Sequence, residues 1–210
     1  MEFVTNPTEI EDKSFEMISE LLGDRQFDPA NLNVIKRVIH TSADFDYADN
    51  LVFSENAVAI GKEALKNGAN IVTDTQMGRS GINKAALQKL GCVTHCFIDS
   101  PEVAEIAKET GQTRARTAVD RAIETLEKPI IFVVGNAPTA LIRLYENIVE
   151  KGFKPDLIIA VPVGFVNVVE SKELILELDI PHIVARGRKG GSNVAAAICN
   201  ALLYETAGRD

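Results

Sequence analysis

Short apolar runs rich in valine and isoleucine recur from residue 70 onward and alternate with stretches of helical periodicity. This alternation is typical of a parallel β-sheet whose strands are joined by helices. The predicted strands are residues 70–73, 92–98, 130–134, 157–161 and 182–185. Two of them, 130–134 and 157–161, are apolar throughout, as expected of central strands that are covered on both faces. The sequence therefore predicts a three-layer, doubly wound α/β fold with a parallel sheet of about five strands.

Helices are expected before, between and after these strands. Thr8 is the expected cap of the first helix, with Glu11 reaching back to it. Asp28-Pro29 opens a second helix that runs to His40, and Ser54 is the expected cap of a third. The remaining helices are predicted over residues 82–90, 102–110, 114–126, 139–151, 171–178 and 193–204.

The composition limits the classes of protein to which this chain can belong. The chain has 210 residues, of which 46% are hydrophobic and 25% charged, an ordinary globular balance. It has neither long linkers nor internal repeats, so residues 1–210 are expected to form a single domain. The net charge of −8 argues against nucleic acid or an anionic membrane as the main partner.

The same composition favours a cytoplasmic protein. Residues 1–12 are acidic and lack the apolar region of a secretory signal. The longest apolar runs stop well short of the roughly 18–20 residues that a membrane span needs. Three cysteines are too few for a disulfide framework, so reduced thiols are expected.

Ligands of doubly wound sheets bind beyond the carboxyl ends of the strands. There the loop 186–193 combines three glycines with Arg186, Arg188 and Lys189 and leads into a helix. Such a helix N-terminus suits a phosphate or a carboxylate, although a flexible, solvated turn would have the same composition. The chain has no P-loop, and Lys189 stands where a dinucleotide fingerprint counted from Gly187 needs glycine.

The three histidines have different settings. His95 and His182 fall in predicted strands, where a structural imidazole is the plainer interpretation. Cys92 and Cys96 flank His95, but a strand sends neighbouring residues to opposite faces, so no metal site is predicted. His40 ends a helix before a polar segment, where its titration range suits general acid–base work.

Several segments together carry a resemblance to the precorrin-8X methylmutase family. They occur in order between about Ile10 and Leu203 and so cover nearly the whole chain. These segments are Arg37-Val38-Ile39-His40, Gly135-Asn136-Ala137-Pro138-Thr139-Ala140-Leu141, Pro162-Val163-Gly164-Phe165-Val166, Glu170-Ser171-Lys172 and Gly187-Arg188-x-Gly190-Gly191-Ser192. The resemblance implies a flavodoxin-like fold, a homodimer and no cofactor.

The resemblance also implies an activity, the movement of a methyl group from ring carbon 11 to ring carbon 12 of a corrin precursor in vitamin B12 synthesis. The product would be hydrogenobyrinate from precorrin-8X or cobyrinate from cobalt-precorrin-8. The family's catalytic histidine falls on His40, and its substrate-contacting serine and arginine fall on Ser14 and Arg37. Thr113-Arg114 also matches and gives a second expected carboxylate site. The segment Thr41-Ser42-Ala43-Asp44 departs from the glycine-containing sequence of many members.

The chemistry of such a substrate agrees with the residues. A corrin precursor carries many carboxylates around an apolar centre, so it needs several separated cationic or N–H donor sites. The expected substrate-binding residues are Ser14, Arg37, Arg114, Asn136, Arg186, Arg188 and Ser192. Two alternatives from other classes are a non-catalytic tetrapyrrole carrier and an enzyme that binds a phosphate ester through the glycine-rich loop.

Overall fold

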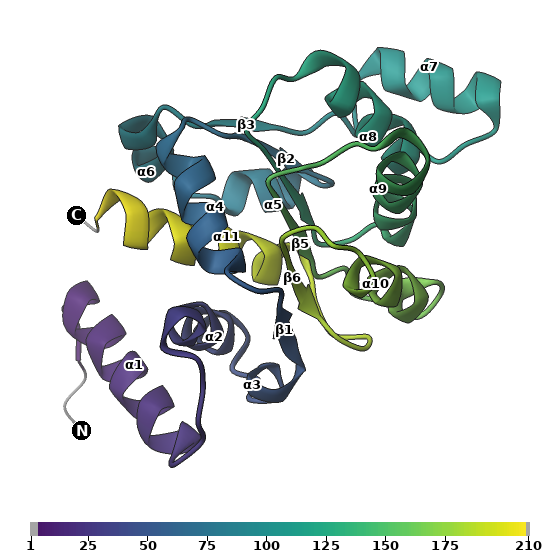
Figure 1. The fold of residues 1–210 in the computed structure, drawn as a ribbon. Helices are drawn as coiled ribbons and strands as arrows, with labels where there is room; N and C mark the ends of the chain where they lie inside the picture. Colours follow the sequence, from purple (N-terminus) through teal and green to yellow (C-terminus); the bar gives the residue numbers. More distant parts are fainter. Residues whose placement is uncertain (1–3, 209–210) are drawn as a thin grey trace.

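The computed structural model describes residues 4–208 and contains a six-stranded sheet between two layers of helices (Figure 1). The first three residues of the acidic N-terminal segment and the last two of the chain lie outside the described residues. The strands are β1 (Leu51–Phe53), β2 (Asn70–Thr73), β3 (Val93–His95), β4 (Ile130–Val134), β5 (Leu157–Ala160) and β6 (His182–Ala185). The predicted α/β class and doubly wound architecture are confirmed.

The five predicted parallel strands are present, and the sheet has one further antiparallel edge strand that the sequence did not indicate. β1 pairs antiparallel with β6, and Leu51 lies opposite Ala185. Its three residues are too few to show a strand pattern in the sequence. The five parallel strands lie in the order β3-β2-β4-β5-β6, which is the flavodoxin-type order. The connection reverses direction between β2 and β4, so their carboxyl ends open the crevice where such folds bind ligands.

The helices fall into two layers. In Figure 1, α7, α8, α9 and α10 cover one face of the sheet, while α4, α5, α6 and α11 cover the other, with α2 packed on α11 and α1 outermost. The bounds are α1 (Pro7–Leu22), α2 (Pro29–Ser42), α3 (Tyr47–Asn50), α4 (Ala57–Lys66), α5 (Gln76–Gly81), α6 (Lys84–Leu90), α7 (Pro101–Thr110), α8 (Arg114–Thr125), α9 (Pro138–Lys151), α10 (Val168–Leu176) and α11 (Ser192–Ala207).

The pleat of the central strands divides the hydrophobic core between the two layers. On β4, Ile131 and Val133 pack toward α2, α4 and α11, whereas Phe132 and Val134 pack toward α8, α9 and α10. All five residues of β4 are buried, as predicted for a central strand. None of the described helices is long and apolar enough to cross a membrane.

Three predicted helix starts are corrected by the caps. α1 begins at Pro7 because the Asn6 side chain, not Thr8, accepts N–H bonds from the first turn. α4 begins at Ala57, because Ser54 instead bonds the backbone of His182 and so extends the β1–β6 ladder. The predicted helix over 82–90 begins at Lys84, capped by Asn83.

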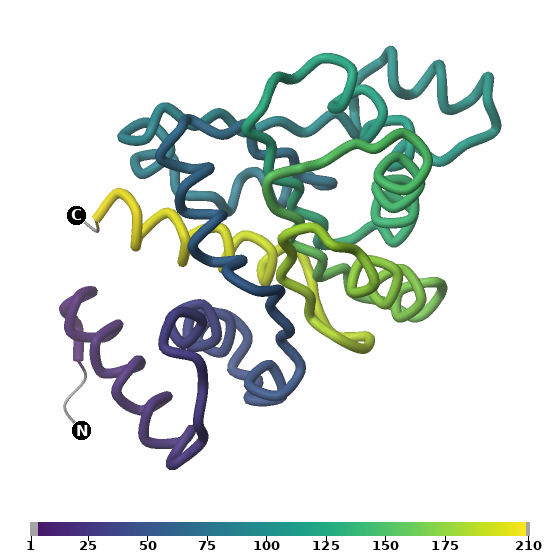
Figure 2. Tube along the Cα trace, viewed as in Figure 1, coloured from purple at the N-terminus to yellow at the C-terminus, as the bar shows by residue number. Residues whose placement is uncertain are grey.

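The predicted start of the second helix, at Asp28-Pro29, is confirmed. The Asp28 carboxylate accepts the N–H of Ala30, and Pro29 opens α2. α2 continues two residues past His40 to Ser42 and ends at Ala43, whose φ is 53°. Figure 2 shows that this N-terminal helix lies beside α11 at the other end of the chain. The candidate functional site lies where these two helices meet.

Candidate functional site

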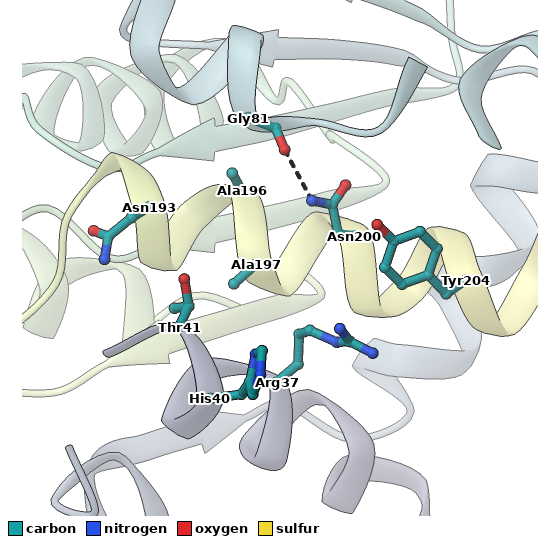
Figure 3. A pocket seen from close by; sticks show the side chains of 9 residues that line it. All are labelled: Arg37, His40, Thr41, Gly81, Asn193, Ala196, Ala197, Asn200 and Tyr204. Carbon is teal, nitrogen blue, oxygen red and sulfur yellow. Dashed lines mark hydrogen bonds between the residues drawn. The ribbon is translucent and has the colours of Figure 1, made fainter. Parts of the chain in front are cut away.

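A pocket of about 290 Å³ lies between α2 and α11 and holds both His40 and Arg37 (Figure 3). Its lining residues are Arg37, His40, Thr41, Gly81, Asn193, Ala196, Ala197, Asn200 and Tyr204. The three-residue spacing of Arg37 and His40 places both on the face of α2 that looks toward α11. The prediction that these two side chains share one face of a helix is confirmed.

His40 lies in the last turn of α2, and part of its side chain is exposed to solvent. One face of its imidazole stacks on Phe15 of α1, with ring centroids 5.3 Å apart. The stacked ring fixes the orientation of the imidazole while its nitrogens stay accessible to a ligand. This is a suitable setting for a group that exchanges a proton with a bound molecule.

Arg37 is held more tightly than the sequence suggests. Its guanidinium lies between the rings of Phe15 and Tyr204, at 4.6 and 5.1 Å from their centroids. Nη1 donates a hydrogen bond of 2.6 Å to Glu11 of α1, and both side chains are largely buried. Nε is buried without a hydrogen-bond partner among the described residues. Arg37 therefore joins α1 to the wall of the pocket.

The electrostatics of this corner favour a neutral imidazole. Partial burial lowers the pKa of His40, and the positive charge of Arg37 lowers it further. The ordinary value for histidine is near 6.5, so the ring is mostly neutral at pH 7 and gains a proton only below its lowered pKa. His40 thus offers both a proton acceptor and an N–H donor to the pocket near neutral pH.

We expect the pKa of His40 to follow the charges at Arg37 and Glu11. Arg37→Gln removes a positive charge and should raise the pKa, whereas Glu11→Gln leaves Arg37 uncompensated and should lower it. Titration of the His40 ring followed by NMR measures both shifts. Unchanged values in both variants would show that this pair does not control the imidazole.

The glycine-rich loop is packed closely against the end of β5. A Cβ atom on Gly190 would lie 2.1 Å from the carbonyl oxygen of Val161. The N–H of Gly191 donates to that same oxygen at 2.9 Å. Gly190 therefore serves contact between backbones, and the Gly191 amide is not available to a phosphate. This weakens the phosphate-ester interpretation of the loop.

The three basic residues of the loop have different partners. Arg186 forms two hydrogen bonds of 2.9 Å with Glu173. Arg188 is exposed, forms no ion pair with any described residue, and lies 5.8 Å from the ring centroid of Phe165. Lys189 binds Asp44 and Asp46 at 2.6 Å each. Of the three, Arg188 is best placed to receive a ligand carboxylate.

An acidic residue organises the crevice between β2 and β4. The Asp74 carboxylate directly follows β2 and accepts the backbone N–H groups of Gly135, Asn136 and Ala137 at 2.9, 2.7 and 2.6 Å. Burial raises the pKa of Asp74, and the three N–H donors oppose that rise. Asp74 thereby fixes the turn from which the exposed Asn136 side chain projects.

The comparisons with known proteins agree with this geometry. A family model described as precorrin-8X methylmutase matches residues 9–205. The chain belongs to the precorrin-8X methylmutase family. A cobalt-precorrin-8 methylmutase from Salmonella typhimurium is 47% identical, covering 97% of this chain and 98% of that protein. A precorrin-8X methylmutase from Pseudomonas aeruginosa is 41% identical over 84% of this chain and 86% of its own.

Solved structures of the precorrin-8X methylmutase family show the same fold. The crystal structure of precorrin-8X methyl mutase from Thermus thermophilus has a TM-score of 0.88 and 39% sequence identity. The match covers 95% of this chain and 96% of that one. The resemblance stated from the sequence motifs is confirmed at the level of the family and of the fold.

None of the remaining residues predicted from the precorrin-8X methylmutase resemblance lines this pocket. Ser14 is partly exposed on α1, and its hydroxyl donates to the carbonyl of Ile10 at 2.6 Å. Ser192, the first residue of α11, shares a hydrogen bond of 2.7 Å with Thr75. Arg114 is exposed at the start of α8, which Thr113 ties to Thr139 at the start of α9.

The sequence did not point to several residues of the pocket and of the crevice between β2 and β4. Asp74 could have been found, because an acid directly after a predicted strand lies at the ligand edge of the sheet. Phe15 has no local signal in the sequence, because its contact with His40 joins two helices. Asn200 and Tyr204 lie on a helix predicted from its apolar pattern, and only the packing against α2 brings them to the pocket.

Proposed function

We propose that this chain is a methylmutase that moves a methyl group from ring carbon 11 to ring carbon 12 of a corrin precursor. The observation that carries the proposal is the pairing of an accessible, oriented His40 with Arg37 in the pocket between α2 and α11. The reaction is an isomerisation, so substrate and product have the same atoms and the same oxidation level. One carbon–carbon bond breaks and another forms, while the double bonds of the ring rearrange.

His40 supplies the proton transfer in this proposal. Its neutral imidazole exchanges a proton with the conjugated ring as the methyl group migrates, and the proton returns before product leaves. The Phe15 stack holds the ring of His40 in place, which lowers the entropic cost of reaching the reactive geometry. Proton transfer by a positioned side chain contributes about 10²–10⁴-fold to the rate.

Substrate carboxylates bind at separated points around the pocket. Arg188 and Arg114 are exposed and form no ion pair with a described residue, so they suit this role. Asn136 and the start of α11 at Ser192 add polar groups at the carboxyl ends of the strands. Phe165 and Val166, which are 81% and 78% exposed, offer an apolar wall beside Arg188. A ligand with an apolar centre and a charged rim matches this arrangement.

We expect Arg188→Ala to weaken substrate binding about tenfold, since a hydrogen bond to a charged group contributes roughly 1.5 kcal/mol or more. Arg188→Lys should recover only part of the loss, because an ammonium lacks the two-pronged guanidinium geometry. Arg186, which the sequence also placed among the substrate-binding residues, gives the comparison: Arg186→Ala should have little effect, because Glu173 already engages Arg186. Titration by fluorescence quenching at two salt concentrations measures the affinities. Equal losses in both alanine variants would contradict this assignment.

The working enzyme in this proposal is a homodimer. The pocket measures about 290 Å³, at the lower limit of the ~300–1,000 Å³ typical of drug-sized ligands, and a tetrapyrrole is larger than those. A second copy packed beside the exposed Phe165 and Val166 would supply the missing walls and enclose the substrate against these two side chains. Sedimentation should show a dimer at micromolar concentration, and activity per chain should fall on dilution. A fully active monomer would refute this arrangement.

The preferred substrate in this proposal is cobalt-precorrin-8. The relatives from Salmonella typhimurium, Leptospira interrogans and Priestia megaterium, at 47%, 45% and 42% identity, carry the name cobalt-precorrin-8 methylmutase. Cobalt is part of the substrate here and needs no ligand from the protein. We place the reaction in the cytoplasm, in keeping with three free cysteines.

The decisive experiment is incubation of the purified chain with cobalt-precorrin-8 and, separately, with metal-free precorrin-8X. Conversion is followed by ultraviolet–visible absorbance, and a ¹³C label on the migrating methyl group should move from carbon 11 to carbon 12 within one molecule. Faster conversion of the cobalt form supports the preferred substrate. Binding of both compounds without conversion would instead identify a tetrapyrrole carrier.

A further inference from the structure

Lys172 is a wholly buried cation outside the pocket. It lies on α10 in the segment Glu170-Ser171-Lys172, and its side chain has no exposed surface. Its Nζ donates hydrogen bonds of 2.8 Å to the carbonyl oxygens of Gly187 and Lys189. No carboxylate among the described residues pairs with it, and burial lowers its pKa to about 8. An unpaired buried ammonium is unfavourable for stability, which indicates that the role of Lys172 is to fix the groups to which it donates.

Lys172 binds the backbone on both sides of Arg188. The two carbonyls it binds belong to the residues directly before and after Arg188. The carbonyl of Arg188 itself accepts the N–H of Gly164 at 3.2 Å. The three carbonyl groups from 187 to 189 are therefore all fixed, and the exposed Arg188 side chain starts from a fixed backbone.

The same loop reaches the helix that carries His40. The Lys189 ammonium binds Asp44 and Asp46, which follow the end of α2 at Ala43. These two ion pairs are exposed and would contribute little stability on a mobile loop. Because Lys172 fixes the backbone of Lys189, the side chain of Lys189 meets the two carboxylates from a set position. The loop thus connects α10 with the end of α2.

From these contacts we infer that Lys172 is a positioning residue for the substrate. It sets the shape of the 187–191 loop, so that Arg188 faces a carboxylate of the corrin and Lys189 holds the end of α2 beside His40. The inference rests on the proposed methylmutase function for its kinetic consequence. Its structural consequence, a loop ordered by one buried ammonium, does not depend on the reaction.

The test compares Lys172→Met, whose unbranched side chain is one atom shorter and has no donors, with Lys62→Met. Lys62 is a matched control, because it is partly buried and pairs with Glu205 away from the pocket. In Lys172→Met we expect KM to rise about tenfold or more while kcat changes less than about threefold. Hydrogen exchange should become faster in the peptide spanning residues 186–192 and should stay unchanged in α9. Lys62→Met should match the wild type in both measurements.

The outcomes separate the alternatives. Wild-type loop exchange and wild-type KM in Lys172→Met would overturn the inference, and so would a uniform rise in exchange over the whole chain with unchanged KM. If wild-type protein does not convert a corrin precursor, the proposed function fails, and loop exchange still tests the role of Lys172. If Lys172→Met does not fold, Lys172→Arg keeps the charge but not the geometry. Raised KM with faster loop exchange in that variant supports the inference, and wild-type values contradict it.

Discussion

Replacement of His40 by asparagine is expected to lower kcat by about 10²–10⁴-fold while substrate affinity stays within a few-fold of the wild type. The amide can keep a hydrogen bond to the corrin but cannot exchange a proton near neutral pH. Substrate binding does not depend on the stacking of the His40 imidazole on Phe15, so the affinity should survive the replacement. Single-turnover absorbance measures the rate, and fluorescence titration measures the affinity.

A histidine outside the pocket provides the control for this prediction. His95 on β3 forms a hydrogen bond of 2.9 Å with Asn70 and lies outside the pocket between α2 and α11. His95→Asn should therefore keep kcat close to that of the wild type. An active His40→Asn enzyme would remove His40 from the proton-transfer role, and a strong loss of affinity instead of rate would assign it to binding.

Replacement of Gly190 by alanine is expected to destabilise the protein by about 3 kcal/mol, the upper part of the range for overpacking. The added Cβ would lie 2.1 Å from the Val161 carbonyl oxygen and 2.9 Å from the carbonyl carbon of Pro162, so the backbone itself must move. For a chain of this size the loss corresponds to a fall of roughly 6–12 °C in Tm. Thermal unfolding measures it.

The displaced loop should also lose activity in the Gly190→Ala variant. Gly191 could no longer donate to Val161, and Arg188 would move with the loop, so kcat/KM should fall more than Tm alone explains. Gly152→Asn is the control, because a Cβ atom there has nothing within 4 Å and asparagine tolerates its φ of 68°. A stable, active Gly190→Ala protein would show that the loop is not held by backbone contact.

The architecture follows from the sequence because the parallel strands are apolar and separated by helical patterns. β4 was predicted at its observed bounds, since five consecutive apolar residues are buried on both faces. β1 was missed because three residues carry no periodicity, and the pairing of Leu51 with Ala185 joins distant parts of the chain. α5, from Gln76 to Gly81, was missed because its two glycines and polar residues give no helical pattern.

Site residues were predicted where spacing along one helix brings them together. They were missed where contact between distant segments of the chain brings them together. His40 and Arg37 share a face because both belong to one helix. The ion pair of Arg37 with Glu11 joins α1 and α2 and could not be read from spacing. Lysine is usually found at the surface, so the burial of Lys172 could not be predicted, and it is explained by the two carbonyl groups that accept its hydrogen bonds. The glycine-rich loop was expected to bind an anion, whereas Gly190 allows close approach of the backbone that follows β5.

A crystal structure of His40→Asn with bound cobalt-precorrin-8 tests the central claim most directly. The macrocycle should lie between α2 and the carboxyl ends of the strands, with ring carbons 11 and 12 facing residue 40 and a carboxylate on Arg188. The pocket residues on α11, Asn193 and Ala197 among them, should contact the ring. A macrocycle bound elsewhere, or bound here with carbons 11 and 12 turned away from residue 40, would contradict the account.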